Sequence, residues 1–400
     1  MGPADLGLLT RYADHVVSEP DLAARLEEQR PLRVKLGVDP TARHITLGWA
    51  VPLRKLRQFQ DAGHTAVLII GDFTARVGDP SGKSQTRPQL TKEEVDANAE
   101  ACLAQLLDVL SEQNLEVRRN SEWLESLSLA GVLKLSASYT VAQMLERDDF
   151  AKRFNDNRPV SIIEFLYPLL QAYDSVAVQA DVELGGTDQL FNLLVGRDIQ
   201  RAFGQRPQVA LTMPLLVGTD GVHKMSQSLD NYIGIREAAN EMFGKLMRIP
   251  DHLVGQYAAV GAWLAPDEVE RLSQTAQAGG PEAADAKRAV ARAVVALYHG
   301  DAAAIDAEAA FDRVFREHRA PAEVQEAQLP REALAGGVAY LPALLAELGL
   351  AGSRSEARRL ISQGGVRING EPATEEEVPQ DRIRGALIQV GRRRFVRVAS

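Results

Sequence analysis

The chain contains almost no cysteine and lacks any long apolar run. Cys102 is the only cysteine among 400 residues, which excludes a disulfide framework and a zinc site built from cysteines. No apolar stretch is long enough to span a bilayer, and the first residues, MGPADLGLL, lack the charged start of a secretion signal. We therefore expect a soluble, cytoplasmic protein that has no membrane contact and holds no metal tightly.

The charge is acidic overall but unevenly distributed. The formal net charge of −9 argues against a protein that coats nucleic acid along its whole surface. Residues 338–400 contain ten arginines against seven acidic residues, a balance of +3, so the rest of the chain carries −12. A basic end on an acidic body favours a small module for a polyanion. An ordinary solvated charged surface is the alternative, and the balance alone does not exclude it.

The first half of the chain alternates between strand and helix patterns. Arg33–Val38 and Thr65–Ile70 read as buried strands, and Leu47–Ala62 between them reads as a helix. This alternation predicts a Rossmann-like α/β domain, with a parallel sheet covered by helices on both faces. Ligands of such sheets bind beyond the carboxyl ends of the strands. We therefore expect the loops Asp39–Thr46 and Gly71–Ser84 to meet in one cleft.

The remaining chain divides into three further parts. An α/β domain with a connective insertion is expected over residues 1–232, and an α-helical domain over 233–320, where alanine-rich runs occur. Residues 321–337 contain two prolines and two glycines and are expected to be a linker. Residues 338–400 read as helix, turn, helix and short strands, a small α+β domain in which Ser353 or Ser355 caps the second helix.

The first strand carries charges where a central strand is normally apolar. Lys35, Gly37 and Asp39 alternate and share one face. Because unpaired charge is costly on a strand buried on both sides, the pattern predicts a polar pocket with Gly37 leaving space for a ligand. An internal Lys–Asp pair is the alternative.

Two further groups of polar residues follow. Thr74 and Asp79 lie in the loop after the second strand, where a hydroxyl and a carboxylate could hold an ammonium group. Ordinary turn chemistry is the alternative there. Tyr167, Gln171 and Asp174 are spaced as one helix stripe, which predicts either a cavity wall or a solvated face.

Two later segments carry candidate nucleotide contacts. In DVELGGTDQ, the paired glycines allow close approach of a ligand and Asp188 suits a sugar diol. In HKMSQSLDNYIGI, Lys224 could meet a phosphate, and Ser226 and Ser228 could add donors. Without context this second segment would be an ordinary surface loop.

Taken in order, these segments resemble a known family. KLGVDPTA, LRKLRQFQDAGHT, IGDFTARVGDPSGKS, LLQAYD, GGTDQ and KMSQSLDNYIG are similar to the motifs of bacterial tyrosyl-tRNA synthetases, which are class I aminoacyl-tRNA synthetases. The resemblance runs from about Lys35 to Asp251 and resumes in the terminal block. It implies that tyrosine reacts with ATP, accompanied by Mg²⁺, to give tyrosyl-adenylate, and that tRNA(Tyr) then accepts the tyrosyl group. It also implies a homodimer, an anticodon-stem role for the helical domain and RNA binding by the last domain.

The resemblance also implies roles for individual residues. Asp79 would bind the α-ammonium group of tyrosine, and Asp174, with Lys35, would recognise the phenolic hydroxyl. The implied tyrosine site comprises Lys35, Gly37, Asp39, Thr74, Asp79, Tyr167, Gln171, Asp174 and Gln189. The implied ATP site comprises Gly48, Gly186, Asp188, Lys224, Met225 and Gln227. Catalysis at the phosphates is implied for Thr41, Thr46, Gly48, Trp49, Lys224, Ser226, Gln227 and Ser228, and RNA binding for Arg354, Arg358 and Arg359.

The chain departs from the family motifs at two places. The signature His-x-Gly-His falls on residues 46–49, so Thr46 and Trp49 stand where the family has histidines that donate hydrogen bonds to phosphate. Thr46 can donate one bond, Gly48 still lets adenine approach, and the helix N-terminus is expected to offer free amides. Trp49 either faces the site or packs into the core. Gln227 stands where the family has its second motif lysine, which removes a charge.

These departures leave alternatives open. The chain is expected to be an active tyrosine ligase, because the implied tyrosine, ribose and RNA sites are all present. A catalytically weakened paralogue that binds tRNA or another RNA is the first alternative. A related ligase that charges tryptophan is the second, although Asp174 beside Lys35 favours a phenol.

Overall fold

The computed structural model describes residues 3–79, 91–317, 324–330, 333–335, 337–391 and 394–399. Contacts divide the chain into two compact units. The first unit comprises Met1–Ala238 and Lys245–Tyr298, and the second comprises Ala239–Gly244 and His299–Ser400. Within the described residues, no helix is both long and apolar enough to cross a membrane.

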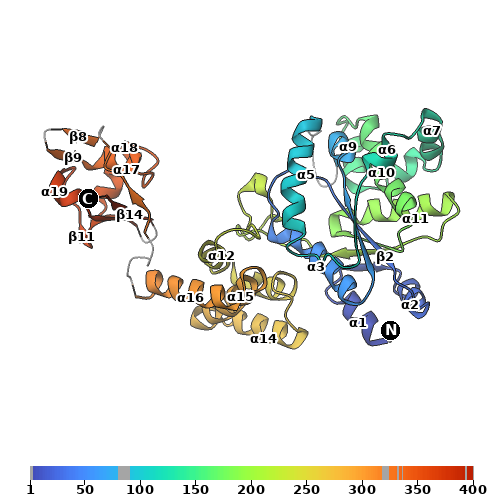
Figure 1. The fold of residues 1–400 in the computed structure, drawn as a ribbon, viewed down its shortest axis with the longest axis horizontal. Helices are drawn as coiled ribbons and strands as arrows, with labels where there is room; N and C mark the ends of the chain where they lie inside the picture. Colours follow the sequence, from blue (N-terminus) through green and yellow to red (C-terminus); the bar gives the residue numbers. More distant parts are fainter. Residues whose placement is uncertain are drawn as a thin grey trace. The chain divides into compact units, whose positions relative to one another are not determined.

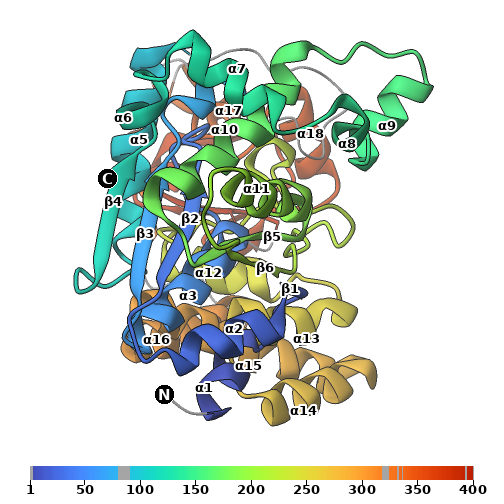
Figure 2. The ribbon, with the colours of Figure 1, turned by 90° about the vertical axis from the view of Figure 1, so that its right-hand side faces the viewer.

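The first unit is built around a six-stranded sheet with the order β1-β6-β5-β2-β3-β4. All neighbouring strands are parallel except β1, which pairs antiparallel with β6. Figure 2 shows this succession across the sheet. The strands are β1 (His15–Val17), β2 (Arg33–Val38), β3 (Thr65–Ile70), β4 (Leu115–Arg119), β5 (Val182–Gly186) and β6 (Val209–Met213).

Helices cover both faces of this sheet, as the alternating pattern predicts. The predicted strands β2 and β3 have the expected bounds, and the predicted helix is α3 (Leu47–Asp61). In Figure 1, α3 lies on one side of the sheet, and α10 (Ile162–Val178) and α11 (Leu190–Ala202) lie on the other. Right-handed crossovers explain this, because β2 to β3 and β5 to β6 run in opposite directions across the sheet.

The other helices of the first unit surround this core. Those before β5 are α1 (Pro3–Thr10), α2 (Glu19–Glu27), α4 (Thr74–Val77), α5 (Lys92–Leu106), α6 (Ser121–Leu124), α7 (Leu129–Ala137), α8 (Val141–Met144) and α9 (Asp148–Asn155). Those after β6 are α13 (Val254–Gln256), α14 (Pro266–Gln277) and α15 (Gly280–His299), and α12 (Ala239–Leu246) contributes to both units.

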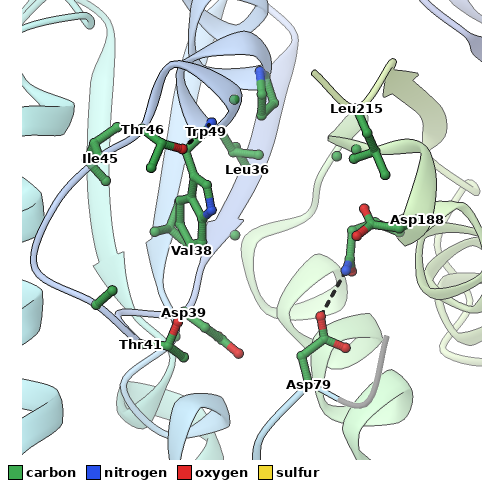
Figure 3. Close-up of a pocket in the computed structure, with 18 of the residues that line it drawn as sticks. Leu36, Val38, Asp39, Thr41, Ile45, Thr46, Trp49, Asp79, Asp188 and Leu215 are labelled. Carbon is green, nitrogen blue, oxygen red and sulfur yellow. Dashed lines mark hydrogen bonds between the residues drawn. The ribbon is translucent and has the colours of Figure 1, made fainter. Parts of the chain in front are cut away.

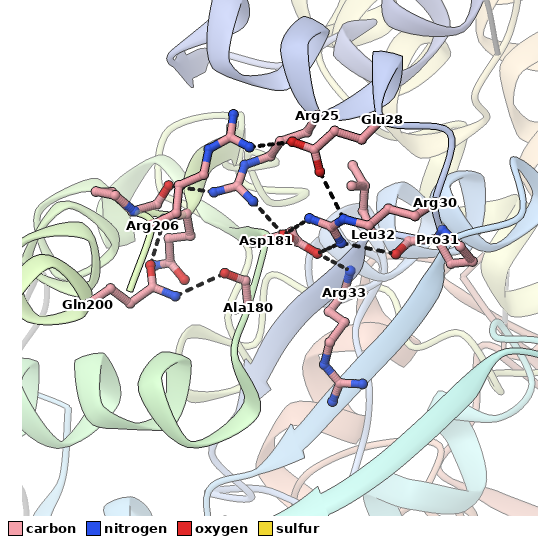
Figure 4. A network of polar contacts seen from close by, with 12 residues as sticks. Arg25, Glu28, Arg30, Pro31, Leu32, Arg33, Ala180, Asp181, Gln200 and Arg206 are labelled. Atoms are coloured by element: carbon pink, nitrogen blue, oxygen red, sulfur yellow. Dashed lines mark hydrogen bonds and ion pairs between the residues drawn. The ribbon is translucent and has the colours of Figure 1, made fainter. Parts of the chain in front are cut away.

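A polar network joins the amino ends of β2 and β5, at the edge opposite the predicted cleft. The carboxylate of Asp181 accepts hydrogen bonds from Arg25, from Arg30 at 2.7 Å and from the backbone N–H of Arg33 at 2.9 Å (Figure 4). Burial alone would raise the pKa of Asp181, but the bonds from Arg30 and Arg33 bring it below its usual value. The network therefore fixes the two central strands relative to each other at this end.

The second unit ends in a small α+β domain with two sheets, of order β11-β10-β13-β14-β7 and β12-β9-β8. Its core contains Leu341, Leu344, Ile361, Val366 and Ile388. The unit contains α16 (Asp301–Phe315), β7 (Glu326–Ala327), β8 (Leu334–Ala335), β9 (Val338–Tyr340), α17 (Leu341–Glu347), α18 (Arg354–Ser362), β10 (Val366–Ile368), β11 (Glu371–Pro372), β12 (Glu377–Pro379), α19 (Gln380–Ile383), β13 (Leu387–Val390) and β14 (Arg394–Val398).

Two details of this domain bear on the sequence predictions. Ser353, one of the two predicted caps, accepts a hydrogen bond from the N–H of Glu356 and begins α18. The segment expected to be a linker includes β7 and β8, which pair with β14 and β9. Part of that segment is therefore built into the sheets of the terminal domain.

Candidate active site

A cavity of about 550 Å³ opens at the carboxyl ends of β2 and β5, where the strand order reverses. Open parallel sheets bind ligands at this point. The two loops expected to meet do so for the residues described, and Pro80–Ser84 lie outside them. The lining includes these residues predicted for the tyrosine, ATP and catalytic sites: Gly37, Asp39, Thr41, Thr46, Gly48, Trp49, Thr74, Asp79, Tyr167, Gln171, Asp174, Gly186, Asp188, Gln189, Lys224, Met225, Ser226, Gln227 and Ser228.

Asp39, which lines the cavity, is held from two sides. Its Oδ1 accepts a hydrogen bond from Thr74 Oγ1 at 2.7 Å, and its Oδ2 accepts one from the hydroxyl of Tyr167 at 2.8 Å. Gly71 makes this arrangement possible, since a Cβ at that position would lie 2.0 Å from Asp39 Oδ1. The sequence placed Gly71 at the start of a loop expected in the cleft but did not indicate this packing role.

Three carboxylates gather in this part of the cavity. Burial, reinforced by the charges of Asp79 and Asp174, raises the pKa of Asp39 to about 7 even though Thr74 and Tyr167 donate to it. Asp79 in turn accepts a hydrogen bond from Gln189 Nε2 at 2.9 Å (Figure 3). A cation placed among these carboxylates would relieve their mutual repulsion. The cluster is therefore suited to an ammonium group.

Asp174 is a buried residue of the cavity lining. Its carboxylate accepts hydrogen bonds from Trp123 Nε1 at 2.8 Å and from Asn120 Nδ2 at 3.3 Å. Burial raises the pKa of Asp174 to about 6, and the positive charge of Lys35 opposes that rise. A carboxylate offers about four acceptor positions, so two remain after these bonds. Asn120 and Trp123 were missed because they follow β4, far from the motifs in sequence.

Lys35 occupies a different place from the one predicted. It is fully buried on β2, and its ammonium group forms an ion pair with Glu183 of β5 at 2.9 Å. It also donates to the carbonyl of Gln171 at 2.9 Å and to Ser175 Oγ at 2.8 Å. Lys35 is not among the residues that line the cavity, whereas Gln171 is. The buried Lys–Asp pair considered from the sequence is thus a Lys–Glu pair, with a partner that the sequence did not identify.

The amides at the start of α3 are mostly occupied. The N–H of Leu47 donates to the carbonyl of Ile233 at 2.7 Å, and that of Trp49 donates to Thr46 Oγ1 at 3.3 Å. Only the N–H of Gly48 has a weak acceptor, the sulfur of Met225 at 3.3 Å. The expectation of a helix N-terminus with free amides is therefore wrong for Leu47 and Trp49, and Gly48 holds the amide most readily released to a ligand.

Thr46 and Trp49 have different surroundings at this helix start. Thr46 is the N-cap of α3 and is buried, and its hydroxyl can still donate a hydrogen bond while it accepts one. Trp49 is 40% exposed and lines the cavity, so it does not pack into the core. Figure 3 shows its indole on the wall opposite Asp188 and Leu215.

The loop after β6 closes one side of the cavity through polar contacts. Lys224 forms an ion pair of 2.8 Å with Asp188, and both side chains remain partly exposed. Gln227 Nε2 donates to the carbonyl of His44 at 2.6 Å, and the hydroxyls of Ser226 and Ser228 lie 2.8 Å apart. The residues predicted to meet ribose and phosphate thus contact one another.

In the terminal domain, Arg354, Arg358 and Arg359 are all exposed on α18, as the helix spacing predicts. Arg358 differs from the other two in its partners. It donates to the hydroxyl of Tyr340 at 2.6 and 3.0 Å and forms an ion pair of 3.3 Å with Glu376.

Comparison with known families places the chain in a class of enzymes. Residues 27–316 match the family described as tRNA synthetases class I (W and Y), and residues 341–379 match the S4 domain, an RNA-binding module. The first match covers well over half of the chain. The α/β fold and the cavity thus define a class I tRNA synthetase of the tryptophan and tyrosine type.

Full-length relatives narrow this class. A tyrosine–tRNA ligase of Moorella thermoacetica is 50% identical over 397 residues, which are 98% of this chain and 95% of the relative. One of Geobacter sulfurreducens is 49% identical over 403 residues, 100% and 99% of the two chains. The chain belongs to the tyrosine–tRNA ligase family.

Solved structures agree on the fold. A C-terminally truncated mitochondrial tyrosyl-tRNA synthetase of Aspergillus nidulans superposes with a TM-score of 0.63 at 24% identity, over 78% of this chain and 93% of that one. The enzyme of Archaeoglobus fulgidus, complexed with L-tyrosine, gives 0.62 at 24% identity, over 76% and 99%.

Proposed function

We propose that this tyrosine–tRNA ligase is catalytically active and carries out both steps within the cavity described above. Tyrosine would attack the α-phosphate of ATP, which enters with Mg²⁺ bound to it, to give tyrosyl-adenylate and pyrophosphate. The 3′-terminal ribose of tRNA(Tyr) would then accept the tyrosyl group. One observation carries the proposal: a carboxylate cluster, the acid Asp188 and the loop of Lys224 face a single cavity at the switch point of the sheet.

The amino acid would bind along the α10 wall. Its phenolic hydroxyl would donate to Asp174, which has acceptor positions left after Trp123 and Asn120. Its α-ammonium group would lie among the carboxylates nearer Asp79 and Asp39, where burial and mutual repulsion favour a cation. The residues proposed to complete this site are Gly37, Thr74, Tyr167, Gln171 and Gln189.

The nucleotide would bind between α3 and the loop after β6. Adenine would lie against Gly48 and Met225, and Asp188, behind Gly186, would accept from the ribose hydroxyls. ATP binding would separate the Lys224–Asp188 ion pair, so that Lys224 could turn to the phosphates. Thr41, Thr46, Trp49, Ser226, Gln227 and Ser228 are the remaining polar groups proposed to face the phosphates. Preorganised donors of this kind stabilise charge that develops in a transition state.

The parts of the chain after the catalytic domain are proposed to bind tRNA. Residues 1–232 would carry out the chemistry, and residues 233–320 would contact the anticodon stem of the tRNA. Residues 321–337 would link this helical part to residues 338–400, which would bind RNA through Arg354, Arg358 and Arg359. Because Tyr340 and Glu376 already engage Arg358, the other two arginines are more available to phosphates. A cytoplasmic location, where tRNA is charged, is part of the same proposal.

A homodimer is proposed on separate grounds. Five large apolar side chains with more than half of their surface exposed come from residues 129–162, which connect β4 to β5: Leu129, Leu133, Val141, Phe154 and Ile162. Exposed apolar residues that gather in one segment of the chain favour an interaction surface there. A second copy of the chain would cover them, and sedimentation of the purified protein would test this.

Exchange of labelled pyrophosphate into ATP is the experiment that tests the activity. Tyrosine should support exchange with a far higher kcat/KM than tryptophan or phenylalanine, and tRNA(Tyr) should then be charged. Exchange that depends on tryptophan would favour the other ligase of the class. Binding of tRNA with no exchange for any amino acid would favour the weakened paralogue.

A further inference from the structure

A buried ion pair lies directly beneath the amino acid part of the cavity. Lys35 and Glu183 face each other from the neighbouring strands β2 and β5, with 0% and 1% of their side chains exposed. Glu183 also accepts hydrogen bonds from Gln171 Nε2 at 3.1 Å, from Ser175 Oγ at 3.1 Å and from Gln208 Nε2. Four donors thus surround one carboxylate, which keeps its charge fully compensated.

Gln171 is held by both members of this pair. Lys35 donates to its backbone carbonyl at 2.9 Å, and Glu183 accepts from its side-chain amide. An ionised carboxylate can only accept hydrogen bonds, so Gln171 must turn its NH₂ group toward Glu183 and its oxygen away. The pair therefore sets the orientation of an amide that lines the cavity.

That orientation propagates along a row of amides. The side-chain oxygen of Gln171 accepts a hydrogen bond from Asn192 Nδ2 at 3.1 Å. The NH₂ group of Asn192 also donates to Gln189 Oε1 at 3.1 Å. Gln189 must then turn its own NH₂ group to Asp79, to which it donates at 2.9 Å. Two further groups hold the same arrangement: Arg147 donates to Asn192 Oδ1 at 3.3 Å, and Asp79 accepts from Gln189. Glu183 is the anchor at the start of the row, where it fixes the NH₂ group of Gln171.

We propose that Glu183, held in place by Lys35, is a positioning residue that acts with Arg147 to orient Gln171, Asn192 and Gln189 and so aims the carboxylate of Asp79 at the ammonium group of the amino acid. This rests on the proposed function. Lys35 would accordingly act from beneath the site through Glu183 and would not contact the substrate. Its positive charge, which opposes the rise that burial causes in the pKa of Asp174, is a second route by which it favours the bound phenol.

The packing around Glu183 is consistent with a fixed position. A Cβ at Gly196 of α11 would lie 2.4 Å from Gln208 Nε2 and 3.1 Å from Glu183 Oε2, so only glycine lets α11 approach this closely. Well-packed apolar residues often replace a buried ion pair without loss of stability. Stability alone is thus a weak reason for this pair, whereas an acceptor-only anchor at the start of the amide row is a specific one.

The test compares variants that separate charge from orientation. Glu183→Gln alone leaves Lys35 buried without its carboxylate and is expected to lower the unfolding temperature. The double variant Lys35→Met, Glu183→Gln removes both charges together, leaves no unpaired ion and is expected to fold. Its amide at position 183 can donate as well as accept, so the row loses the acceptor-only anchor at its start but keeps the anchors at Arg147 and Asp79. The control is Arg33→Met, Glu116→Gln, which removes a partly exposed ion pair between β2 and β4 away from the cavity.

The readout is pyrophosphate exchange as a function of tyrosine and of ATP concentration, together with thermal unfolding. For the folded double variant we expect KM for tyrosine to rise about tenfold or more, equivalent to about 1.4 kcal/mol. The KM for ATP should stay within about twofold, as should both constants in the control. A folded double variant with wild-type KM for tyrosine would overturn the positioning role. Absence of tyrosine-dependent exchange in the wild type would instead refute the proposed function.

Discussion

Among single residues, Asp174 offers the sharpest test of amino acid recognition. Replacing it with asparagine keeps the shape but puts an NH₂ group among the donors of Trp123 and Asn120. We expect kcat/KM for tyrosine to fall about 10- to 100-fold, the size of a lost hydrogen bond to a charged group. Phenylalanine, which has no hydroxyl to pair, should be affected little. Discrimination between these two amino acids is an established property of this enzyme family.

The control for this variant is Asp72→Asn. Asp72 is also a buried carboxylate, and it accepts from the N–H and hydroxyl of Ser121 at 2.9 and 2.7 Å, but it does not line the cavity. Pyrophosphate exchange with both amino acids and thermal unfolding should be measured for each variant. An equal loss for tyrosine and phenylalanine in Asp174→Asn would show that Asp174 is structural.

Trp49 permits a gain-of-function test. Because its indole is on the cavity wall, Trp49→His should fold normally and place a second hydrogen-bond donor near the phosphates. The rate of adenylate formation should rise, by at most about a hundredfold, the effect of one preorganised donor. Pre-steady-state kinetics would measure this, and KM for tyrosine should not change.

Thr46→His provides the contrast. It would add a donor but remove the N-cap of α3, at a cost of about 1 kcal/mol in stability. Its unfolding temperature should therefore fall, whereas that of Trp49→His should not. If Trp49→His folds and forms adenylate at the wild-type rate, the absence of a histidine at position 49 does not limit the rate of adenylate formation.

Among the elements, the loop between β6 and α12 depends on Asn231. This buried side chain accepts from the N–H of Ser226 at 2.7 Å and donates to Asp220 at 3.0 Å and to the carbonyl of Lys224 at 3.2 Å. Asn231→Ala should keep the Lys224 side chain but remove the hydrogen bond that holds the Lys224 backbone. We expect kcat for activation to fall about tenfold or more with KM for tyrosine unchanged, as for Lys224→Ala. A rise in KM for tyrosine with unchanged kcat would contradict this.

Helix α3 carries a buried lysine that makes stability depend on pH. Lys55 is fully buried, and it donates to the carbonyl of Arg11 at 2.7 Å and to Gln58 at 2.8 Å. Burial, with a smaller contribution from Arg11, lowers the pKa of Lys55 to about 7. Between this value and the unfolded pKa of about 10.4, the unfolded chain binds more protons. Lys55 therefore destabilises the protein fully below pH 7 and progressively less as pH rises.

The variant Lys55→Met should remove this dependence. From pH 7 to 9 the wild type should gain stability relative to the variant, by up to about 1.4 kcal/mol per pH unit. Unfolding temperatures at several pH values would show the difference, with Lys152→Met on α9 as the exposed-lysine control. Parallel pH curves for wild type and Lys55→Met would show that Lys55 stays protonated in the folded protein.

The elements near the site were predictable, and their mutual contacts were less so. β2 and β3 have the bounds expected from short apolar runs that end at turns, because local patterning decides where a buried strand stops. The face shared by Lys35 and Asp39 was also predictable. Glu183 was not, because it lies 148 residues from Lys35 and meets it only through the order of the sheet. The occupied backbone amides of Leu47 and Gly48 at the start of α3 were not predictable for the same reason, since their acceptors, Ile233 and Met225, come from a loop distant in sequence.

For the whole molecule, the structure shows where the chain should be shortened to remove the terminal domain, and this place lies before the predicted linker. A cut within the predicted linker, after Ala335, would retain β7 and β8 but remove β14 and β9, their partners. Exposed unpaired strands favour aggregation. A chain that ends at Glu317 keeps α16 and removes the terminal sheets as a set, so it is the better variant.

This shorter chain should separate the two steps of the reaction. Because the cavity lies entirely in the first unit, tyrosine-dependent pyrophosphate exchange should stay within about twofold of wild type. Charging of tRNA should weaken about tenfold or more, and its salt dependence should become shallower, because phosphate contacts are lost. Full-length Arg354→Gln, Arg359→Gln should show a milder form of the same charging defect with normal exchange. A folded truncated chain that exchanges pyrophosphate poorly would show that the terminal domain supports activation itself, and unchanged charging would exclude it from tRNA binding.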